Sequence, residues 1–179
     1  MLTLSLVESG IGKEKLQPID LQLIVKTTLD GLQQLIKNKK AIIETSYESN
    51  LPQIKANADE MLKAVENIIS NALKYSAEEK QIKISVISQR NSEANLKDYP
   101  KRQNFVVFKV EDEGEGIAQK NISRLTERFY RVDKGRSLAM GSTGLGLSIV
   151  NEIVKNHNGL LEIKSTLGEG TIVMIYLPV

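Results

Sequence analysis

The sequence predicts an α+β fold, a two-layer sandwich in which a mixed, mostly antiparallel sheet packs against three helices. Two periodicities support this fold class. Three stretches repeat apolar residues every three or four positions, as one face of a helix does, and several shorter stretches alternate apolar with polar residues, as a strand with one wet face does. Helices that are segregated from mostly antiparallel strands indicate one layer of each.

Composition limits the classes of function that the chain can have. The 179 residues suffice for one domain with at most a short appendage, and 41% apolar residues are enough for a core. The net charge of +2, with both signs interspersed, indicates neither a nucleic-acid partner nor an anionic membrane. The absence of cysteine excludes disulfides and thiolate zinc sites, and a single histidine excludes a multi-histidine metal centre. Because no apolar run reaches membrane-spanning length, we expect a cytoplasmic domain.

The first 15 residues differ in character from the rest. Their leucines could close an amphipathic helix, and Gly10 and Gly12 would stop it before a charged joint. We expect residues 1–15 to be the remnant of an upstream helix plus a linker, and residues 16–179 to be the folded domain.

Local patterns predict the elements of this domain in order. Asp20 is a plausible N-cap for a first helix whose apolar positions run to Ile36. A second helix is expected over 59–75, and a third over 144–156 with Gly159 as its cap. A polar hairpin loop is expected at 91–103 and a turn at 50–52. The predicted strands are 41–47, 53–56, 81–90, 104–110, 160–165 and 171–177.

One face of the second helix carries polar residues whose spacing indicates chemistry. Asn67, Asn71 and Lys74 lie at i, i+4 and i+7, away from the apolar stripe. Asparagine is a mediocre helix former, but its amide oxygen suits Mg²⁺, which usually keeps several waters and shares phosphate oxygens. A lysine one turn further on can neutralise those phosphates. The alternative is a solvated polar face.

A predicted strand ends at Asp112 and runs into Asp112-Glu-Gly-Glu-Gly116. A carboxylate at a strand end can accept a hydrogen bond from an exocyclic amine such as adenine N6, and neighbouring glycines let a flat base approach the backbone. The alternative is an ordinary Asp-Gly turn. For the stretch Gly168-Glu-Gly170-Thr171, the simple turn of a hairpin is the favoured interpretation.

The stretch 124–150 combines an apolar-aromatic patch, a basic run and glycines. Phe129 and Tyr130 are followed by polar and basic residues and then by the glycine cluster 141–146, which leads into the third helix. Glycines and a helix N-terminus expose backbone N–H donors, so this order predicts a phosphate site under a mobile lid. Leu147 stands where a P-loop needs its lysine, and no G-x-G-x-x-G follows a first strand. A glycine-rich surface loop remains the alternative.

His157 is the one conceivable nucleophile or general base in the sequence. It ends the third predicted helix, where the helix dipole favours a cation and the following glycine favours a cap. We therefore interpret it as a capping or surface residue rather than a catalytic one.

Four of these segments stand in an order that resembles the catalytic ATP-binding domain of bacterial sensor histidine kinases. They resemble that family's N, G1, F and G2 boxes, and 168–171 resembles G3. The segments are Asn67-x-x-x-Asn71-Ala-x-Lys74-Tyr75, Asp112-x-Gly-x-Gly116-Ile117, Glu127-Arg-Phe-Tyr-Arg131 and Gly141-x-Thr-Gly-Leu-Gly-Leu147. The resemblance covers residues 16–179 and implies the Bergerat fold, with its flexible ATP lid, that gyrase, mismatch-repair and heat-shock-chaperone ATPases of the GHKL superfamily share. Residues 1–15 resemble the end of the second helix of the dimerisation and phosphoacceptor domain, followed by a linker.

The resemblance implies ATP and Mg²⁺ as cofactors and a role for each matching residue. Asn71 would hold Mg²⁺, while Asn67, Lys74 and Arg131 would form the catalytic set around the phosphates. Asp112 would bind adenine N6. The other nucleotide-contacting residues that the resemblance implies are Tyr75, Gly114, Gly116, Ile117, Phe129 (as the anchor of the lid), Lys134, Thr143, Gly144, Leu145, Gly146, Leu147 and Thr171.

The implied activity is transfer of the γ-phosphoryl group of ATP to a histidine on a phosphoacceptor domain, for relay to a response-regulator aspartate. The amide of Asn67 cannot serve as the water-activating base that related ATPases have there, so we expect slow hydrolysis. Ser142 replaces a frequent glycine, and the phosphoacceptor histidine is absent from these 179 residues. We expect a monomeric fragment of a homodimeric kinase, which can be anchored in the inner membrane. The alternatives are an ATPase or serine kinase on the same fold, and a non-catalytic interaction module.

Overall fold

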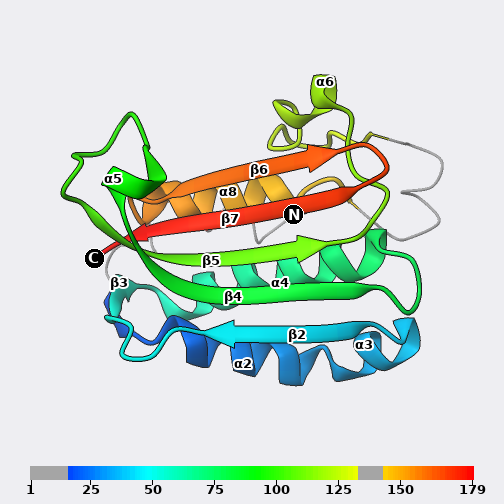
Figure 1. The fold of residues 1–179 in the computed structure, drawn as a ribbon, viewed down its shortest axis with the longest axis horizontal. Helices are drawn as coiled ribbons and strands as arrows, with labels where there is room; N and C mark the ends of the chain where they lie inside the picture. Colours follow the sequence, from blue (N-terminus) through cyan, green and yellow to red (C-terminus); the bar gives the residue numbers. More distant parts are fainter. Residues whose placement is uncertain (1–15, 133–142) are drawn as a thin grey trace.

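The computed structural model of the protein describes residues 16–132 and 143–179. The predicted helix remnant at 1–15, Lys134 and Ser142 lie outside the described residues. Figure 1 shows a layer of strands lying over a layer of helices. In the part of the chain that the structure describes, none of the helices combines the length and the apolarity needed to cross a membrane.

One layer is a five-stranded sheet. Its strands, in spatial order, are β2 (Ile42–Tyr47), β4 (Gln81–Arg90), β5 (Asn104–Asp112), β7 (Gly170–Pro178) and β6 (Leu160–Thr166). The first pair, β2 with β4, is parallel, and the other three pairs are antiparallel. The predicted fold class, a mixed and mostly antiparallel sheet packed against helices, is confirmed.

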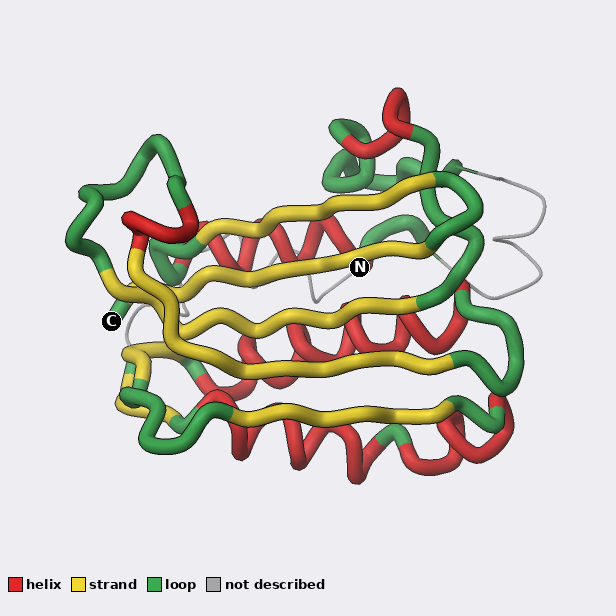
Figure 2. Tube along the Cα trace, in the orientation of Figure 1, coloured by secondary structure: helices red, strands yellow, loops and turns green. Residues whose placement is uncertain are grey.

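The other layer consists of helices on one face of this sheet, as Figure 2 shows. They are α2 (Leu21–Gly31), α3 (Gln33–Lys39), α4 (Ala58–Tyr75) and α8 (Gly146–Asn156). Two short helices, α5 (Asn91–Ala94) and α6 (Gln119–Ile122), lie at opposite ends of the sheet (Figure 1). Because α4 and α8 are neighbours, the two helices with predicted site residues form one packed pair.

The first predicted helix is broken in two, which corrects the sequence-based prediction. Asp20 is its N-cap as predicted, since the carboxylate accepts from the Gln22 N–H at 2.8 Å. At Leu32, however, ψ is 4° and the N–H bonds to the carbonyls of both Thr28 and Leu29. A glycine inside a helix costs about 1 kcal/mol relative to alanine, and Gly31 stands immediately before this break.

The strands predicted at 41–47 and 53–56 exist, but they do not pair with each other. The first corresponds to β2, and the second to β3 (Ile54–Ala56). β3 pairs instead with β1 (Gln17–Ile19), a strand that the sequence analysis did not predict, in a separate two-stranded sheet. The turn between β2 and β3 therefore connects two sheets and is not a hairpin.

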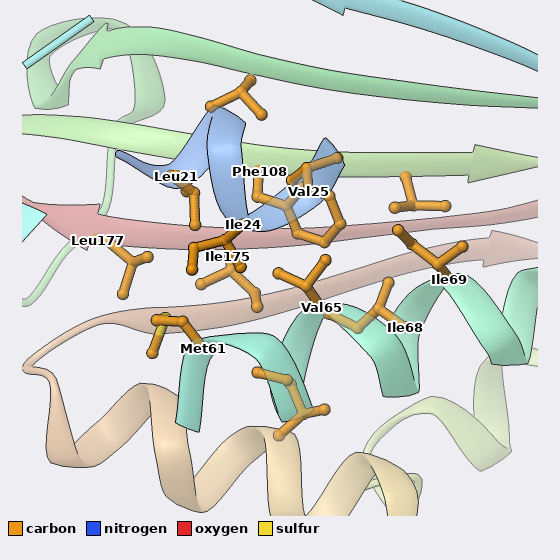
Figure 3. Packing of buried hydrophobic residues seen from close by; sticks show 14 of the residues in the cluster. Leu21, Ile24, Val25, Met61, Val65, Ile68, Ile69, Phe108, Ile175 and Leu177 are labelled. Atoms are coloured by element: carbon orange, nitrogen blue, oxygen red, sulfur yellow. The ribbon is translucent and has the colours of Figure 1, made fainter. Parts of the chain in front are cut away.

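The main core lies between the sheet and the helices. Figure 3 shows side chains of α2 and α4 packed against side chains of β5 and β7, with Phe108 and Ile175 among them. α4 contributes the largest share because its buried positions follow the helical period. These positions are Met61, Ala64, Val65, Ile68, Ile69, Ala72 and Leu73.

A second, smaller cluster lies on the opposite face of the sheet. Phe105 and Tyr176 are its centre, with ring centroids 6.0 Å apart, and Tyr99 packs edge-on against Phe105. The predicted polar loop at 91–103 thus folds over the sheet and begins with the short helix α5. Asn91 holds it in place, because its buried amide accepts from the Leu96 N–H and donates to nearby carbonyls.

His157 is buried, with 6% of its surface exposed, so the prediction of a surface position is wrong. Its Nδ1 lies 2.7 Å from the Ile153 carbonyl oxygen and its Nε2 accepts from the Asn57 N–H at 3.0 Å. A carbonyl can only accept, so Nδ1 carries the proton. The residue therefore ties the end of α8 to the start of α4, and its role is structural.

The cap of α8 also differs in detail from the prediction. Asn158, not Gly159, adopts the left-handed conformation, with φ 54°. The Asn158 N–H bonds to the Lys155 carbonyl and the Gly159 N–H to the Val154 carbonyl, which is the Schellman arrangement.

Candidate functional site

One cavity of about 210 Å³ gathers most of the predicted site residues. It opens between the second half of α4, the end of β5, the segment 115–132 and the start of α8. The predicted residues that line it are Asn71, Tyr75, Asp112, Gly116, Ile117, Arg131, Gly144, Gly146, Leu147 and Thr171. These residues come from all of the motifs that the sequence analysis singled out.

The polar face of α4 meets the start of α8. Asn57 caps α4, accepting from the Asp59 and Glu60 N–H groups, and the apolar stripe then turns Asn67 and Asn71 away from the core. The Asn67 amide nitrogen donates back to the Lys63 carbonyl at 2.8 Å. Its oxygen faces Gly146: a Cβ built at that glycine would lie 2.8 Å from Asn67 Oδ1 and 3.7 Å from Asn71 Nδ2. A larger residue at this position would therefore displace the Asn67 amide.

The N-terminus of α8 lines the cavity without a side-chain cap. Leu145 stands at the N-cap and makes no side-chain hydrogen bond to the first turn, which contains no acidic residue. The first N–H groups of a helix have no partner within it, and they form the positive end of the helix dipole. Donors of this kind suit phosphate oxygens.

Asp112 supplies a carboxylate at the other end of the cavity. Its Oδ1 accepts from the Gly114 N–H at 2.8 Å. Burial raises the pKa of Asp112 above its ordinary value, and the hydrogen bonds from the backbone of Gly114 and Thr171 act in the opposite direction. A Cβ at Gly114 would lie 2.7 Å from this carboxylate and 2.9 Å from the Tyr75 carbonyl oxygen, so the backbone passes close to both. The carboxylate is thus held rigidly beside a bare stretch of backbone.

The stretch 168–171 contains the turn of the β6–β7 hairpin, as predicted, together with the first two residues of β7, and it also belongs to the site. Thr171 pairs with Asp112 in the sheet register and lines the cavity. The Gly168 N–H donates to the Glu115 carbonyl at 2.7 Å, which joins the hairpin to the loop after Asp112.

The segment after α6 forms the outer wall of the cavity. The Tyr130 hydroxyl donates to Asn121 Oδ1 at 3.0 Å, and the guanidinium of Arg124 lies 4.2 Å from the Tyr130 ring centre. The Phe129 ring is 70% exposed, and its backbone N–H bonds to the Gly144 carbonyl at 3.0 Å. The backbone of Phe129 thus ties this wall to the segment just before α8, and the predicted role of Phe129 as the anchor of the lid stays a prediction.

Several wall residues were not predicted. They are the apolar side chains Ile68, Ala72, Val110, Leu125, Val132, Ile163 and Val173, together with Glu115 and Tyr130. The alternation of Val110, Ile163 and Val173 in their strands marks a buried face but does not distinguish a core from a cavity wall. Of the remaining predicted residues, Lys74, Gly114, Thr143 and Leu145 neighbour the lining in sequence.

The described residues contain no group of three or more acidic, histidine or cysteine side chains that could hold a metal ion. A cation in this cavity would therefore rely on the Asn71 amide together with oxygens of the ligand. Mg²⁺ commonly binds in that way.

A larger hollow of about 360 Å³ lies nearby, and half of its lining residues are charged, such as Lys83, Glu111 and Lys164. Lys83 is exposed between the buried residues Ile82 and Ile84, so this hollow lies on the sheet face opposite the helices. It contains no helix terminus and none of the asparagines. Asp112 and Thr171 line both cavities, but the smaller cavity is the better candidate site, because Asn71 and the start of α8 line it alone.

Fold and site together define a class: a two-layer α+β domain in which an uncapped helix N-terminus and a half-buried carboxylate line one cavity. The chain belongs to the family of histidine kinase-, DNA gyrase B- and HSP90-like ATPases, whose sequence profile matches residues 56–179.

The relatives of this chain include sensor kinases, which are one branch of this family. Sensor protein kinase WalK of Staphylococcus haemolyticus (strain JCSC1435) is 31% identical over 178 residues, which cover 99% of this chain and 27% of that protein. Sensor histidine kinase WalK of Bacillus subtilis (strain 168) is 37% identical over 133 residues, which cover 72% of this chain and 20% of that protein. The chain therefore spans only a minor part of the length of these relatives.

Solved structures share the fold. The structure of full-length ShkA in complex with AMPPNP matches with a TM-score of 0.73 at 21% identity, over 92% of this chain and 32% of that one. The mycobacterial sensor histidine kinase MprB matches with a TM-score of 0.69 at 22% identity, over 91% of this chain and 97% of that one. At these identities the likeness concerns the fold alone.

Proposed function

We propose that this chain is the ATP-binding catalytic domain of a two-component sensor histidine kinase. It binds Mg-ATP and donates the γ-phosphoryl group to a histidine on a phosphoacceptor domain, for relay to an aspartate of a response regulator. The observation that carries the proposal is the convergence of Asp112, Asn71 and the uncapped N-terminus of α8 on one cavity. The names of the relatives support the kinase branch of the family.

The proposed roles follow from the chemistry of each group. Asp112, an acceptor when ionised, binds the exocyclic amine of the base, and Gly116 and Ile117 lie against its ring. The N–H groups at the start of α8, from Gly144 to Leu147, bind the phosphate chain. Asn71 holds the magnesium ion, which neutralises charge on the phosphates when it is bound.

The chain contributes position and charge to phosphoryl transfer. Arg131 lines the cavity, and Lys74 lies one helical turn beyond Asn71. Both place positive charge near the terminal phosphates, where it stabilises the charge of the transition state. Asn67 is an amide whose nitrogen is bound to the Lys63 carbonyl, so it has no proton-accepting base to offer to water. We expect a hydrolysis rate far below ~1 s⁻¹, the lower end of ordinary enzyme turnover.

Calorimetric titration with ADP, with and without Mg²⁺, tests the nucleotide site. Wild-type protein should bind with help from magnesium, and Asp112→Asn should weaken binding by about 100-fold, because an amide presents a donor where the ligand's amine needs an acceptor. Asp98→Asn, the same change at an exposed position in the loop 91–103, is the matched control and should bind as wild type does. A folded wild-type protein that binds no nucleotide would favour an interaction module instead.

Transfer of labelled phosphate onto an added phosphoacceptor domain tests the reaction. Acid-labile phosphohistidine is the expected product. An acid-stable phosphoserine, or rapid release of phosphate without transfer, would identify a serine kinase or an ATPase on the same fold. Since the substrate histidine belongs to another domain, we propose that residues 1–15 end that preceding domain, and that residues 16–179 act as a monomer on the cytoplasmic side, where ATP is available.

A further inference from the structure

The hydroxyl of Ser165 joins three segments behind the cavity. Ser165 lies on β6 and is half-buried. Its Oγ is 2.8 Å from the Ile117 nitrogen, 2.6 Å from the Gly170 carbonyl oxygen and 2.9 Å from the Thr171 Oγ1. One side chain therefore connects the loop after Asp112 to both residues at the start of β7.

The chemistry of these partners fixes the direction of every proton. A serine hydroxyl has one proton and two acceptor lone pairs. The Gly170 carbonyl can only accept, so the contact at 2.6 Å uses the proton of Ser165. The Ile117 N–H can only donate, and it occupies one lone pair of Ser165. The contact at 2.9 Å then needs a proton from Thr171, so the Thr171 hydroxyl donates to Ser165.

The direction of the hydrogen bond between Thr171 and Ser165 determines whether Thr171 presents a donor or an acceptor to the cavity that it lines. Because its proton is directed to Ser165, its hydroxyl oxygen presents only lone pairs to a ligand. Thr171 is also the register partner of Asp112 in the sheet, and an ionised carboxylate likewise only accepts. The edge of the cavity formed by Asp112 and Thr171 thus contains two acceptors and no side-chain donor.

We propose that Ser165 is a positioning residue that sets base specificity: by holding Thr171 as an acceptor, it favours a 6-amino purine over a 6-oxo purine. A 6-amino group can donate one hydrogen bond to each of the two acceptors. A 6-oxo group is itself an acceptor, so it would form no hydrogen bond with either of them. This inference rests on the proposed function, since it concerns the same nucleotide site. Without Ser165 the Thr171 hydroxyl rotates freely and can donate to a 6-oxo group.

The experiment compares the affinities of the whole 179-residue chain for Mg-ADP and Mg-GDP by calorimetry. In Ser165→Ala, the ratio of GDP Kd to ADP Kd should fall by about five- to tenfold relative to wild type, the scale of one hydrogen bond. Ser165→Thr keeps the hydroxyl and should restore the ratio. Ser85→Ala, the same change at a half-buried serine of β4, is the matched control and should leave the ratio unchanged.

Thr171→Val shows whether Ser165 acts through Thr171. This near-isosteric change removes the hydroxyl, so the ratio should fall by a similar factor, and adding Ser165→Ala to it should lower the ratio no further. A general loosening of the fold would instead weaken ADP and GDP binding equally. That result, or additive effects in the double variant, would overturn the role of Ser165 and leave the proposed function standing. A folded wild-type protein that binds neither nucleotide would overturn both.

Discussion

The two ends of the α4–α8 helix pair are built in opposite ways. At one end, which we call the closed end, His157 at the C-terminus of α8 accepts from Asn57 at the N-terminus of α4. At the other end, which we call the open end, Gly146 of α8 approaches Asn67 and Asn71 of α4. The helices thus run antiparallel, and each end joins a terminus of α8 to a different part of α4.

The difference between the ends lies in their hydrogen bonds. At the closed end the imidazole is buried with both ring nitrogens bonded, and Asn57 caps the first turn of α4. At the open end, Leu145 leaves the first turn of α8 without a side-chain cap. Satisfied polar groups stabilise the fold, whereas unsatisfied ones remain available to a ligand.

Breaking the closed end should have the largest effect on stability. His157→Ala removes the acceptor for the buried Asn57 N–H and leaves a cavity, so the free energy of unfolding should fall by about 2–4 kcal/mol. Urea unfolding followed by circular dichroism measures this loss. The ADP dissociation constant of the folded variant should stay within about twofold of wild type, because the hydrogen bond that is lost lies at the closed end and makes no contact with the ligand.

The control for this variant is Lys155→Ala, which truncates an exposed side chain in the same helical turn. It should change the free energy of unfolding by less than about 0.5 kcal/mol. If His157→Ala were equally mild, or if it weakened ADP binding more than it weakened folding, the closed end would not have the purely structural role that its hydrogen bonds indicate.

The sequence predicts the open end better than the closed one. The open end depends on local patterns: the Asn67–Asn71 spacing on one helix, the glycines before α8 and the strand that ends at Asp112. The contact between His157 and Asn57 joins residues 100 positions apart, and no local pattern reveals it. His157 was accordingly predicted as a capping or surface residue: it is the C-cap of α8, but it is buried and not on the surface.

The sheet shows the same limit. Alternation locates β4, β5, β6 and β7 within a few residues, because it depends only on the neighbours of each residue. The parallel pairing of β2 with β4 and the separate sheet of β1 and β3 depend on distant partners. The sequence analysis missed the hydrogen bonds of Ser165 for a related reason: Thr171 lies just across the predicted hairpin, but Ile117 is 48 positions away.

A side chain added at the open end should weaken ADP binding while leaving the stability of the fold almost unchanged. In Gly146→Ala the new Cβ would lie 2.8 Å from Asn67 Oδ1, so the amide must move. We expect the ADP Kd to rise by about tenfold, roughly 1.4 kcal/mol. The free energy of unfolding should change by less than about 1 kcal/mol, because alanine favours the helix while the contact opposes it. Calorimetry and urea unfolding measure the two quantities.

Gly31→Ala is the matched control for that substitution. Gly31 is also a helical glycine, at the end of α2, and nothing lies within 4 Å of a Cβ built on it. The variant should be as stable as wild type or slightly more so, and it should bind ADP unchanged. Equal ADP affinities for Gly146→Ala and Gly31→Ala would mean that the close approach at Gly146 does not matter for the ligand.

The smallest expected effect is the contribution of Asp112 to the pH dependence of stability. The test is whether this contribution increases or decreases as the pH rises. Burial raises the pKa of Asp112 above its ordinary value of 3.8, so between that value and the raised one the folded protein holds a proton that the unfolded chain has released. The stability that this group contributes is therefore fully present below pH 3.8 and is lost as the pH rises through the raised pKa. Asp112→Asn cannot titrate, so its free energy of unfolding relative to wild type should increase from acid to neutral pH. The ADP affinity of wild type should increase over the same range, because the carboxylate ionises. Urea unfolding and calorimetry across this range measure both trends. A relative stability of Asp112→Asn that decreased toward neutral pH would contradict the assignment of Asp112 as a half-buried carboxylate kept for a ligand.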